Sequence, residues 1–234
     1  MGVHIQRVSD RVLALGTMGA VRVMAGKPSA GGDWWDPLGE GLCVVAAYQA
    51  KGAASLAASY TDLSGSGHDA GVGVAPTWGS SDGWIFNGST QYLTTTFVPA
   101  EDHSQSIIVQ FSSAVGDAGY LVGSDQAANR EFGILPLYLG TQVRYWNGND
   151  TPVAPKLAAG NLAVAGAQGY RSGSAEGGAI PAWAGASSMP LYIGCNNNAG
   201  AGEFLAVKIQ ALAIYDSTLT SDQVAAVAAA MAAL

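Results

Sequence analysis

The stretch at residues 84–93 constrains the fold more than any other part of the chain. It reads Trp-Ile-Phe-Asn-Gly-Ser-Thr-Gln-Tyr-Leu, so apolar residues alternate on both sides of Asn87-Gly88. Asn and Gly both accept positive φ, which a two-residue type I′ turn requires at its central positions. Trp84 and Phe86 share one face, because successive side chains of a strand point to opposite faces. The pattern therefore predicts a β-hairpin that carries two aromatic side chains into a core.

Runs with the pattern of β-strands recur along the chain at the spacing of a β-sandwich, with turn residues between them. They lie at residues 42–48, 106–112, 120–124, 130–139, 142–148, 162–168, 191–194 and 204–215. The last run needs a bulge to keep its apolar residues on one face. A second Asn-Gly pair, Asn147-Gly148, is predicted to form a turn. No repeat of fixed period is evident, which disfavours a propeller or solenoid.

A short α-helix is predicted to follow the last strand. Thr220 and Gln223 have the spacing of a capping box, and Asp222 favours the positive end of the helix dipole. Val224, Val227 and Met231 then recur at helical spacing. The helix therefore has one apolar face, which we expect to pack on a sheet.

These motifs, in this order, resemble the laminin G-like domains, a family of concanavalin A-type β-sandwiches. The resemblance rests on the Phe-Asn-Gly stretch followed by Tyr92, the polar loop at residues 62–70, and a closing strand that ends at Tyr215 before a short helix. It implies an all-β, concanavalin A-like β-sandwich, or jelly roll, over residues 34–234 with a short C-terminal helix. Residues 1–33 lie outside the resemblance and are predicted to form a separate N-terminal β-arm and linker.

The predicted arm contains two short strand-like runs and three of the ten cations of the chain, Arg7, Arg11 and Arg22. A hairpin alone is marginally stable in water. The arm is therefore expected to dock, either on its own domain or on another subunit. These three arginines are the candidate assembly residues.

Composition excludes several functions. The chain has 10 Lys plus Arg against 17 Asp plus Glu, a net charge of −7, whereas sequence-independent nucleic-acid binding needs clustered cations. No apolar run is long enough to span a bilayer, and the first residues do not make a good secretion signal. Only 12% of residues are charged, and a surface of small polar residues suits burial in an assembly.

Catalytic motifs are weak in this sequence. Glycoside hydrolases of jelly-roll shape need two carboxylates placed to flank a glycosidic bond. Here the acids are scattered, with Glu131 and Glu203 each isolated in the sequence. The chain is therefore predicted not to be an enzyme, and a glycoside hydrolase is the least favoured interpretation.

Two groups of residues could bind a sugar, which requires aromatic faces together with amide or carboxylate partners for hydroxyl groups. The first group is Tyr145, Trp146, Asn147 and Asn149, and the second is Asn196, Asn197 and Asn198. Each tryptophan also fits a core position, which is the competing interpretation.

Calcium at a loop rim is the one cofactor that remains open, because many laminin G-like domains carry it. Asp62, Asp69 and Asp150 could supply carboxylate oxygens, but no loop shows a fixed calcium consensus. The competing interpretation is turn chemistry, in which Asp and Asn bond to their own backbone.

The favoured function is a non-catalytic virion protein, either a capsid decoration or tail-associated, that displays the sandwich and attaches through residues 1–33. This layout resembles phage or metagenomic structural proteins. The expected partners are other virion proteins or further copies of the chain, in a homo-oligomer. The alternative is a carbohydrate-binding module of a bacterial surface or secreted protein, extracellular or at the cell surface, with a cell-surface glycan as ligand.

Overall fold

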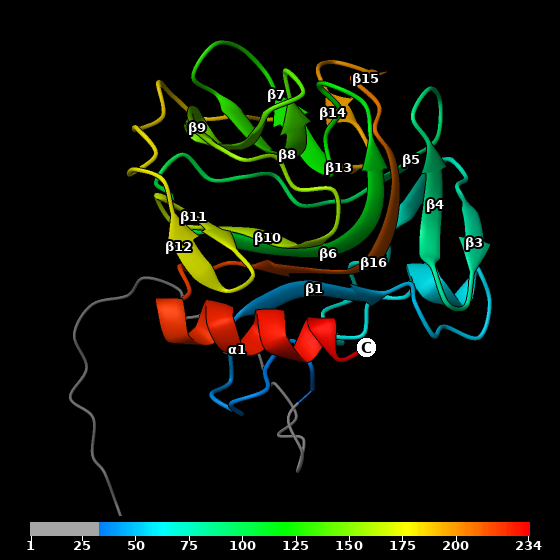
Figure 1. Ribbon diagram of the computed structural model, residues 1–234. Coiled ribbons are helices and arrows are strands. Elements are labelled where there is room, and N and C mark those ends of the chain that lie inside the picture. The colour runs from blue at the N-terminus through cyan, green and yellow to red at the C-terminus, as the bar shows by residue number, and fades with distance from the viewer. Residues whose placement is uncertain (1–32) are drawn as a thin grey trace, which may run out of the picture.

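A computed structural model describes residues 33–234 (Figure 1). Two antiparallel sheets face one another as a β-sandwich, with a single helix below them among the described residues, so the predicted fold class is confirmed. Residues 1–32 lie outside the described part of the chain, and with them lie Arg7, Arg11 and Arg22. The N-terminal arm therefore stays a prediction.

The larger sheet has eight strands in the order β12-β11-β10-β6-β16-β4-β3, and β1 also pairs with β16. Its strands are β1 (Val44–Gln49), β3 (Thr77–Gly79), β4 (Gly83–Asn87), β6 (Ser106–Val115), β10 (Gly160–Ala165), β11 (Gln168–Arg171), β12 (Ser174–Glu176) and β16 (Ala206–Tyr215). The pairing of β16 with β6 shifts register between Ile209 and Ala211, which confirms the predicted bulge. In Figure 1, β6 and β16 bend upward toward the second sheet.

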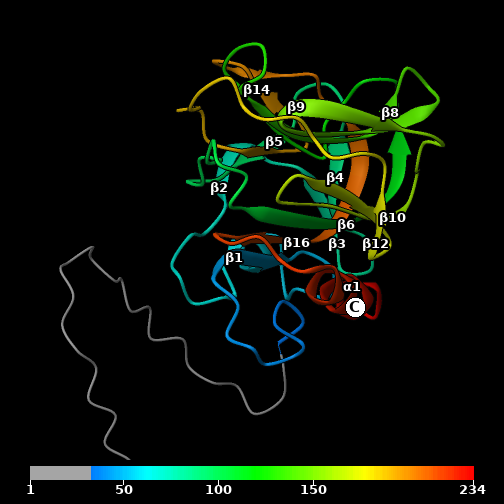
Figure 2. The same cartoon turned by 90° about the vertical axis from the view of Figure 1, so that its left-hand side faces the viewer.

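The smaller sheet has six strands in the order β2-β5-β13-β7-β8-β9. They are β2 (Gly71–Val74), β5 (Tyr92–Thr94), β7 (Val122–Asp125), β8 (Glu131–Tyr138), β9 (Gln142–Val153) and β13 (Tyr192–Ile193). A two-stranded ribbon, β14 (Asn196–Asn197) with β15 (Ala201–Gly202), lies beside it, and a 3-10 turn, η1 (Ala58–Tyr60), follows β1. Figures 1 and 2 show this sheet as the upper layer.

The main core lies between the two sheets. Trp84 and Phe86 are buried in it, as predicted, together with Phe111 and Phe132. The indole Nε1 of Trp84 donates to the Ser59 hydroxyl at 2.7 Å, so burial leaves this donor satisfied. Each such side chain contributes about 1.5–3 kcal/mol relative to exposure.

A second apolar cluster joins helix α1 (Ser221–Ala232) to the outer face of the larger sheet. The capping box of Thr220 and Gln223 is present, and Val224, Val227 and Met231 are buried, as predicted. Figure 2 shows the helix end-on beneath the sheet. Within the described residues, no helix is both long and apolar enough to cross a membrane.

The prediction of a hairpin at Asn87-Gly88 is wrong. Strand β4 pairs with β3 and β16, whereas β5 pairs with β2 and β13, so the chain crosses here from one sheet to the other. The Asn87 side-chain oxygen accepts the N–H of Ser89 at 2.9 Å, and the φ of Gly88 is 71°. A Cβ on Gly88 would lie 2.7 Å from the Ala206 nitrogen. Asn87 and Gly88 therefore lie where the chain passes from one sheet to the other, close against Ala206, and they do not form a two-residue turn.

The predicted turn at Asn147-Gly148 is also wrong, because both residues lie inside β9 and pair with Phe132 and Glu131 of β8. Gly148 has a φ of 94°, and a Cβ there would lie 2.5 Å from Cδ1 of Trp183. Glycine is therefore required for the approach of an indole ring, not for chain reversal.

Candidate functional site

The structure places Tyr145 and Asn147 in the core, on the inner face of β9. The Tyr145 hydroxyl donates to Glu176 Oε1 at 2.6 Å. The Asn147 amide donates to the Gly166 carbonyl at 2.7 Å and accepts from Trp183 Nε1 at 2.9 Å. These side chains are buried and hydrogen-bonded, so a ligand at the surface does not reach them.

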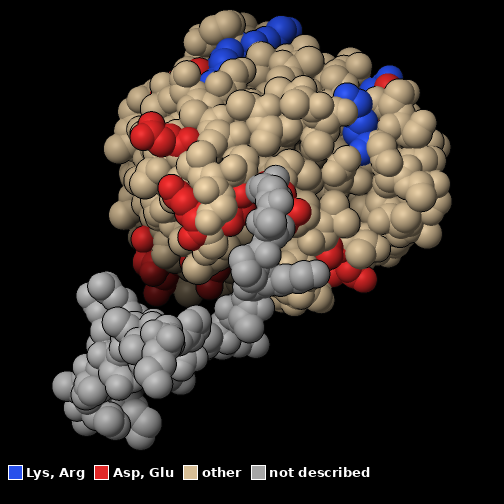
Figure 3. All heavy atoms as spheres, turned by 90° about the horizontal axis from the view of Figure 1, so that it is seen from below, with Lys and Arg blue, Asp and Glu red and all other residues tan. Residues whose placement is uncertain are grey.

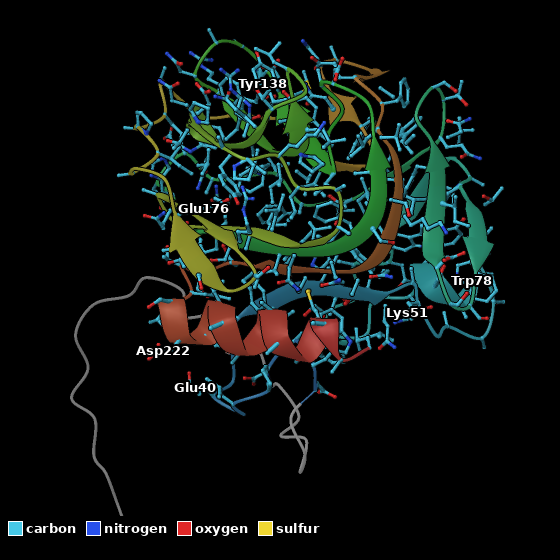
Figure 4. The ribbon with its side chains drawn as sticks, in the orientation of Figure 1. Glu40, Lys51, Trp78, Tyr138, Glu176 and Asp222 are labelled. Atoms are coloured by element: carbon cyan, nitrogen blue, oxygen red, sulfur yellow. The ribbon has the colours of Figure 1, made fainter. Side chains whose placement is uncertain are left out.

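Trp146 points to the opposite face of β9 from Tyr145, because side chains alternate along a strand. The Arg144 guanidinium carbon lies 3.9 Å from the ring centroid of Tyr138, which Figure 4 labels near the top, and 5.2 Å from that of Trp146. Asp150 forms an ion pair with Arg144 at 2.6 Å. Of the four predicted sugar residues, Tyr145 and Asn147 are thus buried, whereas Trp146 and Asn149 are partly exposed.

The second predicted sugar group is largely structural as well. Asn196 and Asn197 form β14 and are buried. Asn196 donates to Glu203 Oε2 at 2.9 Å, and Asn197 donates to the Pro190 carbonyl at 2.8 Å. Only Asn198 is exposed. Within this group, Asn198 alone is therefore accessible to a ligand.

The three predicted calcium ligands do not converge. The Asp62 carboxylate accepts the N–H groups of Ala47 at 2.9 Å and His68 at 3.1 Å, and Asp69 accepts that of Asp62 at 2.8 Å. Burial opposes ionisation, but these hydrogen bonds hold the pKa of Asp62 below its usual value. Asp150 lies on β9 of the other sheet. In residues 33–234, no group of three or more His, Cys, Asp or Glu could hold a metal ion.

A carboxyl cluster appears where the sequence showed only isolated acids. Asp125 and Glu131 are direct partners across β7 and β8, and the Tyr120 hydroxyl donates to Glu131. Burial, and then repulsion from Asp125 and Glu203, raises the pKa of Glu131 to about 8, against the opposing hydrogen bond from Tyr120. Burial and the nearby Glu203 also raise the pKa of Asp125. The register of β7 on β8 places Asp125 opposite Glu131, and the segment between β15 and β16 supplies Glu203.

A pocket of about 550 Å³ with both apolar and polar lining opens beside β1. Four separate segments build it: the chain before β1 together with the start of β1, the loop after η1, the chain after β5, and the residue after β16. Its apolar lining is Trp35, Leu42, Val44, Val45, Phe97 and Val98, and its polar lining includes Asp33, Asp36, Ser64, Ser66, His68, Thr96 and Asp216. None of the sugar or calcium residues predicted above lines it.

Hydrogen bonds between distant segments hold the walls of this pocket in place. The Tyr215 hydroxyl donates to the Trp35 carbonyl at 2.8 Å, and the Asp216 N–H donates to the Cys43 carbonyl at 3.0 Å. The Asp36 carboxylate accepts the N–H of Gly41 at 2.8 Å, which fixes the loop before β1. The pocket is therefore built into the sandwich by β16, whose end supplies two of these contacts.

The polar groups of the pocket are placed to bind hydroxyl-rich molecules. His68 Nδ1 and the Thr96 hydroxyl lie 2.7 Å apart, and the side chains of Asp33 and Asp216 form no hydrogen bond or ion pair within the described residues. A half-buried Trp35 supplies an aromatic surface beside these acceptors. An apolar wall with a few convergent polar groups is typical of a small-molecule site.

Two sequence signals lie at this pocket. The Trp34-Trp35-Asp36 stretch comes directly before the first strand, and the polar loop at residues 62–70 carries Ser64, Ser66 and His68. Nothing in their sequence separation shows that they meet, because Asp216 and residues 96–98 complete the same pocket from elsewhere in the chain.

Comparison with solved structures supports the fold. Domain 4 of AbnA, an extracellular arabinanase from Geobacillus stearothermophilus solved in complex with arabinotriose, has a TM-score of 0.57 at 17% identity, over 80% of this chain and 98% of that one. The Trypanosoma rangeli sialidase in complex with 2,3-difluorosialic acid has a TM-score of 0.56 at 16% identity, over 80% of this chain and 32% of the sialidase.

The receptor-binding domain of botulinum neurotoxin C/D mosaic serotype has a TM-score of 0.51 at 10% identity, over 80% of this chain and 51% of that one. No family model matches the sequence, and neither does any curated protein. At these identities the likeness shows a shared β-sandwich, and the laminin G-like relationship stays a resemblance.

Proposed function

We propose that this protein is a non-catalytic carbohydrate-binding module and that its glycan site is the pocket beside β1. The observation that carries this proposal is the pocket itself: about 550 Å³, with Trp35 on one wall and carboxylate and hydroxyl groups converging from other segments. Aromatic faces take the C–H surface of a sugar, and carboxylates accept its hydroxyl protons. The volume accommodates a short oligosaccharide.

The comparisons supply a second, weaker support. Domain 4 of the arabinanase was solved in complex with arabinotriose. The match covers 80% of this chain and 98% of that domain, and the two share the β-sandwich fold. The fold is thus compatible with glycan binding. The chain covers 32% of the sialidase, so the activity of that whole enzyme carries no weight here.

The proposal assigns no catalytic role to this protein. Among the described residues, burial raises the pKa of Glu131 to about 8, in the range of a general acid, but this residue is only 7% exposed and is engaged by Tyr120. A proton donor must reach the glycosidic oxygen, which a covered carboxyl does not do. Glu131 therefore acts within the fold.

The virion role, the homo-oligomer and the cellular location stay predictions from the sequence. Deleting residues 1–32, which leaves the pocket residue Asp33 in place, tests the assembly arm: loss of oligomerisation on size-exclusion chromatography would support it, and an unchanged oligomeric state would count against it.

A glycan array, read with calcium and with EDTA, tests the proposed function. We expect binding in both conditions, because the pocket offers no group of metal ligands among the residues described. Val98 lines the pocket and is 40% exposed, so Val98→Trp should block it without disturbing the core. Val115, 67% exposed and outside the pocket lining, gives the matched control Val115→Trp.

We expect Val98→Trp to lower the affinity for the glycan at least about tenfold, a change of about 1.4 kcal/mol in binding free energy. Val115→Trp should bind the glycan with the affinity of the native chain. The absence of binding to any glycan, or equal binding by the two variants, would overturn the proposal.

A further inference from the structure

The charge of the pocket restricts which sugars can enter. Three aspartates line it, Asp33, Asp36 and Asp216, whereas none of the described lining residues is Lys or Arg. Figure 3 shows Asp and Glu gathered on the face seen from below, with Lys and Arg only toward its upper part. Glu40 and Asp222, labelled in Figure 4, lie on the same lower side. A negatively charged ligand that entered the pocket would be repelled by the three aspartates that line it.

The hydrogen-bonding groups of the pocket point to the same chemistry. Ser64 and Ser66 already donate, to Asp62 and to the Val44 carbonyl, at 2.7 and 2.9 Å. The carboxylates of Asp33 and Asp216, in contrast, have no partner within the described residues. The pocket thus presents more free acceptors than free donors, and its ligand must supply the protons.

We infer that the pocket selects sugars that carry a free amine and rejects carboxylated sugars such as sialic acid. This inference rests on the proposed function and adds its selectivity. A protonated amine brings a positive charge and three donors to the carboxylates of Asp33 and Asp216, whereas a sugar carboxylate brings only further acceptors and a like charge. Asp216 is the residue best placed to hold the amine, because its side chain is exposed and its backbone is fixed by Cys43.

Titration calorimetry with three soluble oligosaccharides tests this selectivity at about pH 6, where a sugar amine is protonated. The probes are a glucosamine trimer, the same trimer fully N-acetylated, and sialyllactose. The first two differ only in charge and the acetyl group. We expect the amine form to bind at least about fivefold more tightly than the acetylated form, a difference that shrinks as salt is added, and we expect no binding of sialyllactose.

Two variants separate a specific contact from general attraction to an acidic protein. Asp216→Asn should lower affinity for the amine form about fivefold and leave the acetylated form unchanged. Asp117→Asn removes the same charge at a remote place, because Asp117 follows the far end of β6 from Ser106, which pairs with Tyr215. It should bind as the native chain does. Thermal melting of both variants confirms that they are folded.

The possible failures are distinct. If no probe and no array glycan binds, the proposed function itself fails. If the acetylated trimer or sialyllactose binds as tightly as the amine form, and Val98→Trp still abolishes binding, then the glycan site stands and the selectivity is refuted. Equal losses in Asp216→Asn and Asp117→Asn would also refute it, because the attraction would then be non-specific.

Discussion

Replacing Glu131 by Gln is expected to change how stability depends on pH. The carboxyl is buried beneath Tyr120, opposite Asp125, and its pKa rises from 4.5 to about 8 on folding. The folded state therefore holds this proton more tightly than the unfolded state does. The resulting stabilisation is complete below pH 4.5 and is lost as the pH rises through 8. Gln has nearly the same shape as Glu and stays neutral at every pH, so the Glu131→Gln variant does not lose this stability as the pH rises.

The size of the effect follows from the shift. Each pH unit between the two pKa values costs about 1.4 kcal/mol, so the full loss has an upper bound of about 5 kcal/mol. Asp125, whose pKa is also raised by burial and by Glu203, contributes a smaller loss of the same sign that the variant retains. At about pH 8 the variant should therefore be more stable than the native protein by a few kcal/mol, and near pH 5 the two should be similar.

Urea unfolding followed by tryptophan fluorescence at a series of pH values measures this directly. The control is Glu101→Gln, because Glu101 is exposed and its replacement should leave the slope unchanged. The same slope for native protein and Glu131→Gln between about pH 5 and 8 would refute the account of Glu131 as a proton held by burial.

Two further substitutions test structural roles assigned above. Asn147→Ala removes the acceptor for Trp183 Nε1 and leaves buried polar groups unsatisfied, so it should cost about 3 kcal/mol or more by chemical denaturation, whereas Asn198→Ala, at an exposed position, should cost under about 0.5 kcal/mol. Gly88→Ala forces an alanine to positive φ against a neighbouring strand, so it should lower the free energy of unfolding by more than about 2 kcal/mol. Gly65 has a φ of 79° in open space, so Gly65→Ala should lower it by about 1 kcal/mol. Equal losses in the two variants would contradict the role of Gly88 in the close passage of the chain between the two sheets.

Local patterns predicted the elements whose stability is local. Apolar runs predicted β1, β6 and β16, and the capping box predicted the start of α1, with Thr220 as its N-cap. The Asn-Gly pairs were predicted to have positive φ at both residues, and only the glycines, Gly88 and Gly148, do. What the Asn-Gly pattern could not show is whether the next strand joins the same sheet, because that depends on partners such as β13, far along the chain.

The candidate site could not be predicted from local sequence patterns, because it also depends on contacts between distant segments. Trp146 and Asn147 are adjacent in the sequence, yet they lie on opposite faces of β9, so a cluster in sequence was not a cluster in space. The pocket has the reverse property: Trp35, Thr96 and Asp216 are remote in sequence and meet only when β16 closes the larger sheet.

A crystal structure of the protein with the tightest-binding glycan from the array tests the central claim most directly. The account predicts sugar density in the pocket beside β1, with a ring against Trp35 and a hydroxyl or amine within hydrogen-bond distance of Asp216. Density on the outer face of the smaller sheet, at Trp146 and Arg144, would contradict it and would return the binding site to the strand that the sequence pattern favoured.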